Sequence, residues 1–490
     1  MVRETIESTP ADVTRRALRG VVALGIRQAT TQGANVVGSI LLARLLSPAE
    51  FGLFAVLTFA VSFLNSFGGT GLAANFIRDV REPSEDDYRA LFGVQEFVVL
   101  VTAAAFYAAA SEFARLYHLT SSGAWLFRLT ALSFALTSLM VVPQVRLERH
   151  LNFGRLAFVE TGQALLYNGT AVVLAWRGYG ALSFALAVMI RAATGVVLVN
   201  LMSPWSPKVR WDWPRARRHL AFGLPYQGIA VVSLIKDSVN PVFVGLLLGT
   251  QNVGYLSWAG LLANYPVVGL LALQRLYLPM FARLQAAPDL GRSVERTIAA
   301  TNALVAPLAV LTLVLVHPIV HLVFGDKWTT ALPIFYILWI GNFFVATATP
   351  LLGLLNALGQ AKTALLFATV WMVGTWVLAP PLVAAVGVVG FAWANLCIQA
   401  TNLLLFRAAQ ARVQFHILPS VMPSWLWAAL MGLGMSVTQH IWPATQLAPL
   451  VAYLLCGLTT YTLGIVVMYR RNLAVIWLSW RMRSCAPAPQ

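Results

Sequence analysis

Residues 298–324 read IAATNALVAPLAVLTLVLVHPIVHLVF and contain no aspartate, glutamate, lysine or arginine. A helix rises about 1.5 Å per residue, so this run is long enough to cross the hydrocarbon core of a bilayer, which is about 30 Å thick. Similar apolar runs recur along nearly the whole chain of 490 residues, which is 59% hydrophobic and only 11% charged, with a mean hydropathy of +0.73. This composition excludes a water-soluble fold and predicts an all-α integral membrane protein.

The apolar runs predict about 14 transmembrane helices. Six lie near residues 18–46, 51–77, 90–116, 125–145, 156–176 and 180–202. Six more lie near residues 220–248, 255–281, 298–324, 331–355, 363–383 and 388–406, and two final helices lie near residues 425–441 and 447–468. The first run is too long for a cleaved secretory signal, so we expect the first helix to stay in the membrane.

The distribution of basic residues predicts the orientation of the chain. Most loop arginines and lysines fall in alternate loops, and the loops between them hold only Arg44, Arg115, Arg128, Arg177 and Lys327. By the positive-inside rule, both termini are then cytoplasmic. The net charge of +16 is spread over short loops instead of one basic domain, so the charge does not indicate nucleic-acid binding.

Two parts of the chain resemble each other in order. Residues 45–52, LLSPAEFG, match residues 247–254, LLGTQNVG, at an offset of 202, and residues 143–151, PQVRLERHL, match residues 350–358, PLLGLLNAL, at an offset of 207. Chance similarity between apolar segments is the alternative explanation. The matches predict two parallel six-helix repeats, which form two lobes about an axis along the membrane normal.

These features predict the organisation of the chain. Between the repeats, residues 211–222, WDWPRARRHLAF, are typical of an interfacial helix on the inner leaflet. The predicted parts are a cytoplasmic N-terminal segment (1–17), an N-lobe (18–205), a cytoplasmic amphipathic linker (206–219), a C-lobe (220–412), two further helices (413–470) and a cytoplasmic tail (471–490).

Charged residues inside predicted spans are the first candidates for a transport site, because an unpaired charge in a bilayer is costly. The basic ones are Arg27, Arg191, Lys236 and Arg275, and the one deeply placed carboxylate is Asp237. Arg27 and Arg275 could instead snorkel to the inner boundary, and Arg191 could pair with a helix carbonyl or with Glu160. Asp237 could form a structural ion pair with Arg27 or Arg275.

Polar residues extend two of these sites into stripes. Arg27, Thr31 and Asn35 share one face of the first helix, and Ser233, Asp237 and Asn240 share one face of the seventh. At the offset of 202, Thr31 corresponds to Ser233 and Asn35 to Asp237, so we expect the two stripes to line a hydrated cavity between the lobes. Lys236 lies beside Asp237 and is expected to point too far round the helix to pair with it directly.

Eight other amides in the spans are expected to bond between helices instead of contacting a ligand. They are Asn65, Asn75, Asn168, Asn302, Asn342, Asn395, Gln399 and Asn402. We predict no catalytic residue, no metal site and no cofactor: Cys397, Cys456 and Cys485 form no ligand spacing, and no phosphate-binding loop is present. His317, His321, Asp326 and Lys327 are interpreted as a solvated boundary.

Four segments carry a resemblance to a known family. They are residues 35–56, NVVGSILLARLLSPAEFGLFAV; 240–260, NPVFVGLLLGTQNVGYLSWAG; 273–284, LQRLYLPMFARL; and 350–366, PLLGLLNALGQAKTALL. With them, nearly the full chain resembles the polysaccharide transporters of the multidrug/oligosaccharidyl-lipid/polysaccharide (MOP) flippase superfamily, which includes O-antigen and exopolysaccharide repeat-unit flippases.

The resemblance implies a V-shaped, two-lobed transporter in the bacterial inner membrane. It implies a lipid-linked oligosaccharide substrate, carried on undecaprenyl pyrophosphate and turned across the membrane by alternating access, for exopolysaccharide, O-antigen or capsule biosynthesis. Membrane lipids and other polysaccharide assembly proteins are the implied partners. Arg27 occupies a place comparable to that of cavity arginines in the related lipid II flippases, and guanidinium groups suit a pyrophosphate or an acidic sugar.

Two other functions compete with this one. A multidrug extruder of the same superfamily would carry mostly cationic substrates, which favour a cavity richer in acids. A membrane polysaccharide polymerase or glycosyltransferase would need a larger outer loop or acidic residues near a membrane boundary, and the outer loops here are short. We therefore predict a transporter and not an enzyme.

Overall fold

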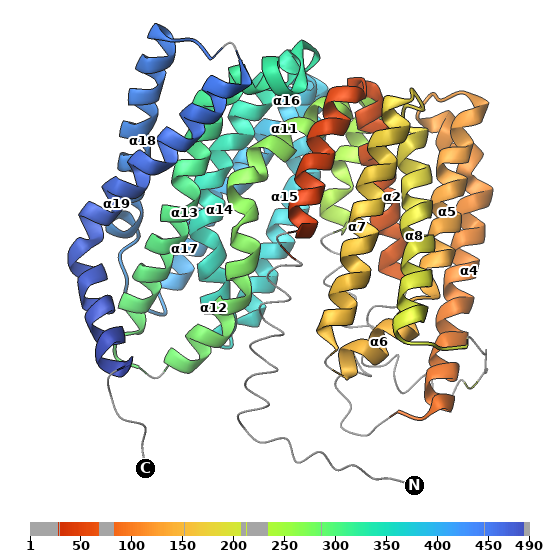
Figure 1. Ribbon diagram of the computed structural model, residues 1–490, viewed down its shortest axis with the longest axis horizontal. Coiled ribbons are helices and arrows are strands. Elements are labelled where there is room, and N and C mark those ends of the chain that lie inside the picture. The colour runs from red at the N-terminus through yellow and green to blue at the C-terminus, as the bar shows by residue number, and fades with distance from the viewer. Residues whose placement is uncertain are drawn as a thin grey trace. The chain divides into compact units, whose positions relative to one another are not determined.

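The computed structural model describes residues 28, 30–67, 83–150, 152–206, 212, 234–285, 287–444 and 446–484, apart from a few side chains. Nine helices in these residues are long and apolar enough to cross a membrane, or ten when a bent pair is counted as one span. The described parts of the predicted spans are mostly helical, with turns at residues 139–140, 180–181, 238, 269 and 401 (Figure 1). The chain is therefore an all-helical, multi-span membrane protein over the described residues, and the count of 14 stays a prediction.

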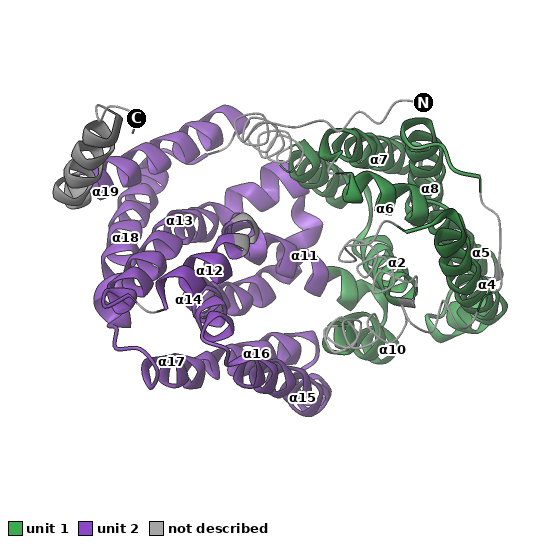
Figure 2. Cartoon of the chain, turned by 90° about the horizontal axis from the view of Figure 1, so that it is seen from below, with its two compact units in different colours: residues 1–254 green, residues 255–490 purple. Residues whose placement is uncertain are grey.

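The chain divides into two compact units, residues 1–254 and 255–490 (Figure 2). The first unit begins with a helix that is described over residues 30–45. It continues with α2 (Pro48–Phe67), α4 (Glu85–Leu116), η1 (Ser121–Gly123), α5 (Ala124–Ser138), α6 (Val141–Arg149), α7 (Phe153–Trp176), α8 (Leu182–Met202), the π-helix η2 (Val239–Val244) and α10 (Gly245–Leu248). In this unit α5 packs between α4 and α8, and α7 packs on α8.

The second unit contains the remaining helices. They are α11 (Thr250–Val268), which begins in the first unit, α12 (Leu270–Leu284), α13 (Leu290–Ile319), η3 (Val320–Phe324), η4 (Asp326–Ala331), α14 (Leu332–Ala357), α15 (Ala361–Val386), α16 (Val388–Ala400), α17 (Asn402–Gln410), α18 (Ile417–Ile441) and α19 (Leu447–Ser484). Helices α14 and α18 both pack on α13, and α19 packs on α13 and α18.

Two helices of the first unit begin at capping boxes. The Ser84 hydroxyl accepts a hydrogen bond from the Asp87 backbone at 3.2 Å, while the Asp87 carboxylate accepts from the Ser84 backbone at 2.9 Å. Ser47 and Glu50 form the same reciprocal pair before α2, with Pro48 at the first helical position. Each pair satisfies backbone donors that a helix start leaves free, which fixes where α2 and α4 begin.

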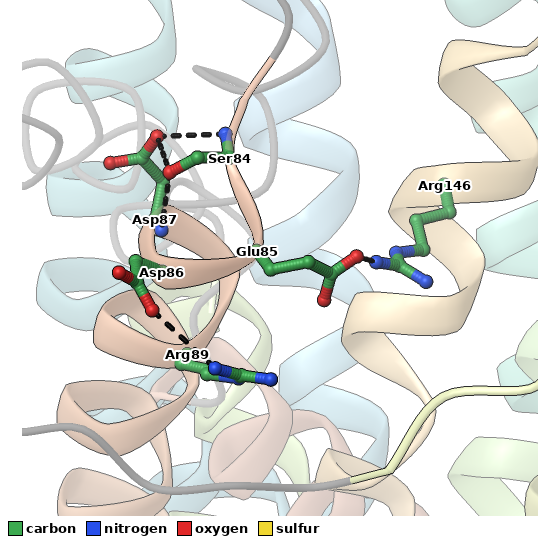
Figure 3. A network of polar contacts seen from close by, with 6 residues as sticks. All are labelled: Ser84, Glu85, Asp86, Asp87, Arg89 and Arg146. Carbon is green, nitrogen blue, oxygen red and sulfur yellow. Dashed lines mark hydrogen bonds and ion pairs between the residues drawn. The ribbon is translucent and has the colours of Figure 1, made fainter.

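Polar contacts tie the start of α4 to α6 (Figure 3). The Arg146 guanidinium pairs with the Glu85 carboxylate and lies 5.0 Å from the centre of the Tyr88 ring. Beside this pair, Arg89 contacts Asp86 at 3.4 Å (Figure 3). Below the polar contacts, Tyr88 packs in an apolar cluster with residues of α4 and α6, so the ends of these helices are joined by both charge and packing.

A close backbone crossing joins α2 to the start of α11 within the first unit. A Cβ atom added at Gly52 would lie 1.8 Å from the Thr250 carbonyl oxygen, and one at Gly254 would lie 1.9 Å from the Pro48 carbonyl oxygen. The two contacts are reciprocal, and both pairs of positions are related by the offset of 202 seen in the sequence. Reciprocal contacts of this kind are typical of a local two-fold axis, and the two six-helix repeats stay a prediction.

Amide and indole groups hold the core of the second unit. The fully buried Asn302 of α13 accepts a hydrogen bond from Trp425 Nε1 of α18 at 2.9 Å and donates one to Thr347 of α14 at 3.4 Å. Trp339 Nε1 of α14 donates to the Ala309 carbonyl of α13 at 2.7 Å. These bonds link three helices at one level and hold α18 against the core of the second unit.

Candidate functional site

A polar cavity of about 350 Å³ lies inside the helix bundle of the first unit. Four helices each turn one face toward it, because the lining residues on each recur at intervals of three or four. The polar lining residues are Thr58, Ser62 and Asn65 from α2, Thr130, Ser133 and Thr137 from α5, Gln163 and Tyr167 from α7, and Arg191 from α8. A bundle that faces inward with polar side chains is typical of a hydrated interior in a membrane protein.

The five serine and threonine hydroxyls of this cavity share one hydrogen-bonding state. Each donates to a carbonyl of its own helix one turn earlier, at 2.7 to 3.0 Å. A hydroxyl has one proton to donate and two lone pairs that accept, so a hydroxyl whose proton is already engaged in a hydrogen bond can only accept further bonds. The walls formed by α2 and α5 therefore present oxygen acceptors to whatever occupies the cavity.

Among the described residues that line this cavity, Arg191 supplies the only charge. It lies midway along α8, and its guanidinium carbon is 5.7 Å from the centre of the Tyr167 ring on α7. The Gln163 amide, one turn before Tyr167, donates to the Arg191 backbone carbonyl at 3.3 Å. The ring and this bond hold α7 against α8 and direct the cation into the cavity.

A break in the fourth predicted span forms one end of the cavity. Helices α5 and α6 meet at an angle of 41°, and Met140 at the junction lines the cavity together with Gln144 of α6. Next to the break, the Ser138 hydroxyl donates to the half-buried Glu96 carboxylate of α4 at 2.7 Å. The bend therefore exposes polar groups that a straight helix would point elsewhere.

The predicted stripe on the first helix falls partly in the described residues. Asn35 accepts a hydrogen bond from the Asn168 amide of α7 at 2.9 Å. The Thr31 hydroxyl is buried and has no hydrogen-bond partner among the described residues. Arg27 lies outside the described residues. Asn35 is thus joined to a neighbouring helix of its own unit, and its role in a cavity between lobes stays a prediction.

The seventh predicted helix differs from a regular helix where its stripe lies. Lys236 Nζ lies 3.1 Å from Asp237 Oδ1, so the expectation that these neighbours do not pair is wrong. Both residues lie in the α-helical turn that ends at residue 237, before the π-helix that begins at Val239, and the long, flexible lysine side chain reaches the neighbouring carboxylate. Asn240 is half-buried in the π-helix.

Two other predicted site residues are not described. Ser233 lies outside the described residues, and so does the side chain of Arg275. Of the six predicted residues whose side chains are described, only Arg191 lines the cavity of the first unit.

Three amides confirm the prediction of bonds between helices. Asn168 bonds to the first helix, Asn302 accepts from α18, and Asn342 of α14 donates to the Ala263 carbonyl of α11 at 2.8 Å. Asn65 differs, because it lines the cavity of the first unit.

The hydroxyls of the cavity were missed from sequence. Their signal was present, because the sequence TFAVSFLN (58–65) places Thr58, Ser62 and Asn65 on one helical face, as TALSFALT (130–137) does for α5. Single hydroxyls inside apolar runs are common, since they satisfy themselves on their own helix. Only the meeting of several such faces identifies a cavity.

The histidines near the end of α13 form local contacts. His321 pairs with Asp326, and both side chains are exposed. His317 lies 2.9 Å from the Tyr336 hydroxyl of α14. Lys327 lies over the Trp328 ring at 6.0 Å. These contacts agree with a solvated boundary.

Comparison with known proteins identifies the family of the chain. A family model described as "Polysaccharide biosynthesis protein" matches residues 41–333, more than half of the chain. The chain belongs to this family. This polysaccharide biosynthesis protein is 24% identical over 369 residues to the succinoglycan biosynthesis transport protein ExoT of Rhizobium meliloti, a match that covers 75% of this chain and 74% of ExoT.

A second curated relative is the teichuronic acid biosynthesis protein TuaB of Bacillus subtilis. It is 24% identical over 332 residues, which cover 64% of this polysaccharide biosynthesis protein and 68% of TuaB.

Solved structures share the fold of this polysaccharide biosynthesis protein. The lipid II flippase MurJ matches with a TM-score of 0.74 and 16% identity over 93% of this chain and all of MurJ. An inward-facing multidrug resistance MATE transporter of the MOP superfamily matches with a TM-score of 0.60 and 15% identity over 80% of this chain and 98% of its own. The fold is thus that of MOP-superfamily transporters, as the sequence resemblance implied.

Proposed function

We propose that this protein is a flippase that moves lipid-linked oligosaccharide repeat units across the bacterial inner membrane by alternating access. The observation that carries the proposal is the family match over residues 41–333, in a chain with at least nine membrane-length helices among its described residues. The name of ExoT as a transport protein and the fold likeness to the lipid II flippase MurJ support the same role.

The finer parts of the proposal come from the sequence. Undecaprenyl pyrophosphate is the proposed carrier, and membrane lipids and other polysaccharide assembly proteins are the proposed partners. The positive-inside pattern supports cytoplasmic termini. The predicted lobes, 18–205 and 220–412, supply the two bodies that alternating access needs. Transport requires no bond to be made or broken by the protein, so we propose no enzymatic step.

The chemistry of the described cavity bears on the alternative of drug efflux. Its lining residues include one arginine and no aspartate or glutamate. A cationic drug would face a positive charge there with no opposing carboxylate, whereas an acidic saccharide would find a partner. The cavity therefore favours a saccharide substrate over a cationic drug.

The function is tested by deleting the gene in its own host and measuring lipid-linked oligosaccharide in each leaflet. The proposal expects complete undecaprenyl-pyrophosphate-linked units to accumulate on the cytoplasmic side, and wild-type protein to relieve the accumulation. Unchanged amounts of lipid-linked saccharide, together with increased drug sensitivity, would favour the extruder. Incomplete or unpolymerised units on the outer face would favour a membrane enzyme.

A further inference from the structure

We propose that the cavity of the first unit is a saccharide subsite that selects a sugar carrying a carboxylate. The inference rests on the proposed function for the supply of a saccharide, and it adds the chemical class of the sugar and the place where that sugar is read. The pocket lies inside residues 1–254, and the group that it recognises is the sugar and not the carrier pyrophosphate.

The walls require a ligand that donates several hydrogen bonds. On α2, Thr58 and Ser62 donate to the carbonyls of Phe54 and Thr58 at 2.9 and 3.0 Å. On α5, Thr130, Ser133 and Thr137 donate to their own helix at 2.7 to 2.9 Å.

The hydroxyl oxygens of Thr58, Ser62 and Thr137 are therefore acceptors toward the cavity, whereas Thr130 and Ser133 are buried behind them. A sugar ring suits such a wall, because each of its hydroxyl groups can donate one hydrogen bond.

The opposite wall requires a negative charge. Arg191 is the only ionisable cation in the lining, and its described surroundings give it an aromatic face and no carboxylate. A guanidinium in a membrane interior is stable when it meets an anion, and its planar donors match the two oxygens of a carboxylate. The Tyr167 ring beneath it also offers an apolar surface on which a sugar ring can lie.

A phosphate group fits this combination poorly. At pH 7 a phosphate ester is mainly an acceptor of hydrogen bonds, so it would place oxygen lone pairs against the acceptor oxygens of α2 and α5. In the described lining Arg191, Asn65, Gln144 and the Tyr167 hydroxyl offer donors to it, since the Gln163 amide is engaged by the Arg191 carbonyl and the Met140 sulfur. A ring that donates on one side and carries a carboxylate on the other satisfies both walls.

The size of the cavity limits how much of a repeat unit it can hold. Its volume of about 350 Å³ lies near the lower end of small-molecule sites, which span about 300 to 1,000 Å³. The cavity is thus suited to one sugar residue and not to a whole oligosaccharide. The subsite binds one sugar residue of the repeat unit, and the rest of the substrate lies outside this cavity.

The first test measures binding of free sugars to the purified full-length protein by saturation-transfer NMR, with D-glucuronate and D-glucose as probes. We expect Arg191→Gln to weaken glucuronate binding by about tenfold to a hundredfold, the range for a lost charge-assisted hydrogen bond, and to leave glucose binding unchanged. Arg128→Gln is the matched control, because Arg128 also lies over aromatic rings, Tyr107 and Trp125, but does not line the cavity.

A second pair of variants tests the acceptor wall. Thr137→Val keeps the shape and removes one acceptor, so it should weaken binding of both sugars by a few-fold. Thr369→Val is its control, since Thr369 on α15 makes the same bond to its own helix, to the Leu365 carbonyl, outside the cavity. Equal glucuronate affinity in wild type and Arg191→Gln, or no binding of either sugar to wild type, would overturn the proposal, as would displacement of glucuronate by an equal concentration of inorganic phosphate.

A transport measurement separates this inference from the proposed function. Proteoliposomes receive an undecaprenyl-pyrophosphate tetrasaccharide with one glucuronic acid residue, or the same lipid with that carboxyl reduced to an alcohol. We expect Arg191→Gln to slow transport of the acidic lipid alone. An equal loss for both lipids would overturn the selectivity. Failure of wild type to move either lipid would refute the flippase function, while the binding assay still decides the subsite.

Discussion

The reciprocal crossing of Gly52 and Gly254 gives a prediction in which the sign of a glycine-to-alanine effect depends on position. Alanine is normally the better helix former by about 1 kcal/mol, so the substitution should stabilise an open helical site. At Gly52 the new Cβ would lie 1.8 Å from the Thr250 carbonyl oxygen, although real contacts of this kind essentially never fall below 3.0 Å. The two helices must therefore separate by more than 1 Å.

The expected cost follows from what can move. All three obstructing atoms, the Thr250 carbonyl oxygen and carbon and the Gly254 nitrogen, belong to the backbone, so no side-chain rotation relieves the clash. Overpacking of this kind costs about 1 to 3 kcal/mol or more, and the helix-propensity gain offsets up to about 1 kcal/mol of it. We expect Gly52→Ala to lower the free energy of unfolding by about 2 kcal/mol, and Gly254→Ala to do the same.

The measurement is unfolding of the purified protein in mixed micelles with increasing SDS, followed by circular dichroism. Gly33→Ala is the control, because Gly33 also lies in a helix of the first unit and no atom of the described residues lies within 4 Å of its added Cβ. It should be neutral or stabilising by up to about 1 kcal/mol. The double variant of Gly52 and Gly254 should cost less than the sum, since one separation serves both. The same sign at Gly33 and Gly52 would refute the reasoning.

Three further predictions concern single hydrogen bonds. Trp425→Phe keeps an aromatic side chain but removes the N–H that donates to Asn302. A double-mutant cycle with Asn302→Ala in the same SDS assay should give a coupling free energy of about 0.6 to 1.7 kcal/mol. A coupling of zero would contradict the hydrogen bond. Ser84→Ala removes the cap of α4 and should lower unfolding stability by about 1 kcal/mol, and hydrogen exchange should increase at the start of α4 alone. Burial raises the pKa of Tyr117 to about 12, and its hydroxyl donates to the Pro241 carbonyl at 2.8 Å, so it stays protonated in the folded protein at a pH where an unfolded tyrosine, with a pKa near 10, ionises. The free energy of unfolding of the wild type should therefore fall more steeply than that of Tyr117→Phe as the pH rises from 10 to 12. Parallel curves for the two proteins would contradict the burial.

The sequence predicted helices well because the bilayer leaves little choice of backbone structure. Apolar runs such as residues 90–116 must satisfy their own backbone groups, and α4 indeed covers that run, starting five residues earlier at its capping box. The Ser47 and Glu50 pair likewise marks the start of α2 in the printed sequence. Local chemistry of this kind needs no knowledge of neighbours.

The bend between α5 and α6 and the composition of the cavity depend on packing between helices that are distant in sequence, so the sequence alone did not predict them. In residues 125–145 the one signal that separates α5 from α6 is Pro143 in the first turn of α6, and it does not give the 41° angle between the two helices. Helix geometry alone argues against a pair between Lys236 and Asp237, because adjacent residues point in different directions, but it takes no account of how far the lysine side chain can bend. Arg191 was identified by its cost in a bilayer, but its hydroxyl-lined surroundings come from four separate helices.

The glycine crossing also says something about how this chain can change over time. If the two repeats descend from one ancestral segment that paired with a second copy of itself, a single glycine once faced its own copy across the symmetry axis. Duplication and fusion of the gene turned that one position into two, 52 and 254, each of which still limits the other. Neither position can accept a residue larger than glycine while the two helices stay in contact at this crossing. Among homologues, residues at these two positions should therefore be replaced together, and a lone replacement should coincide with a rebuilt contact between the helices.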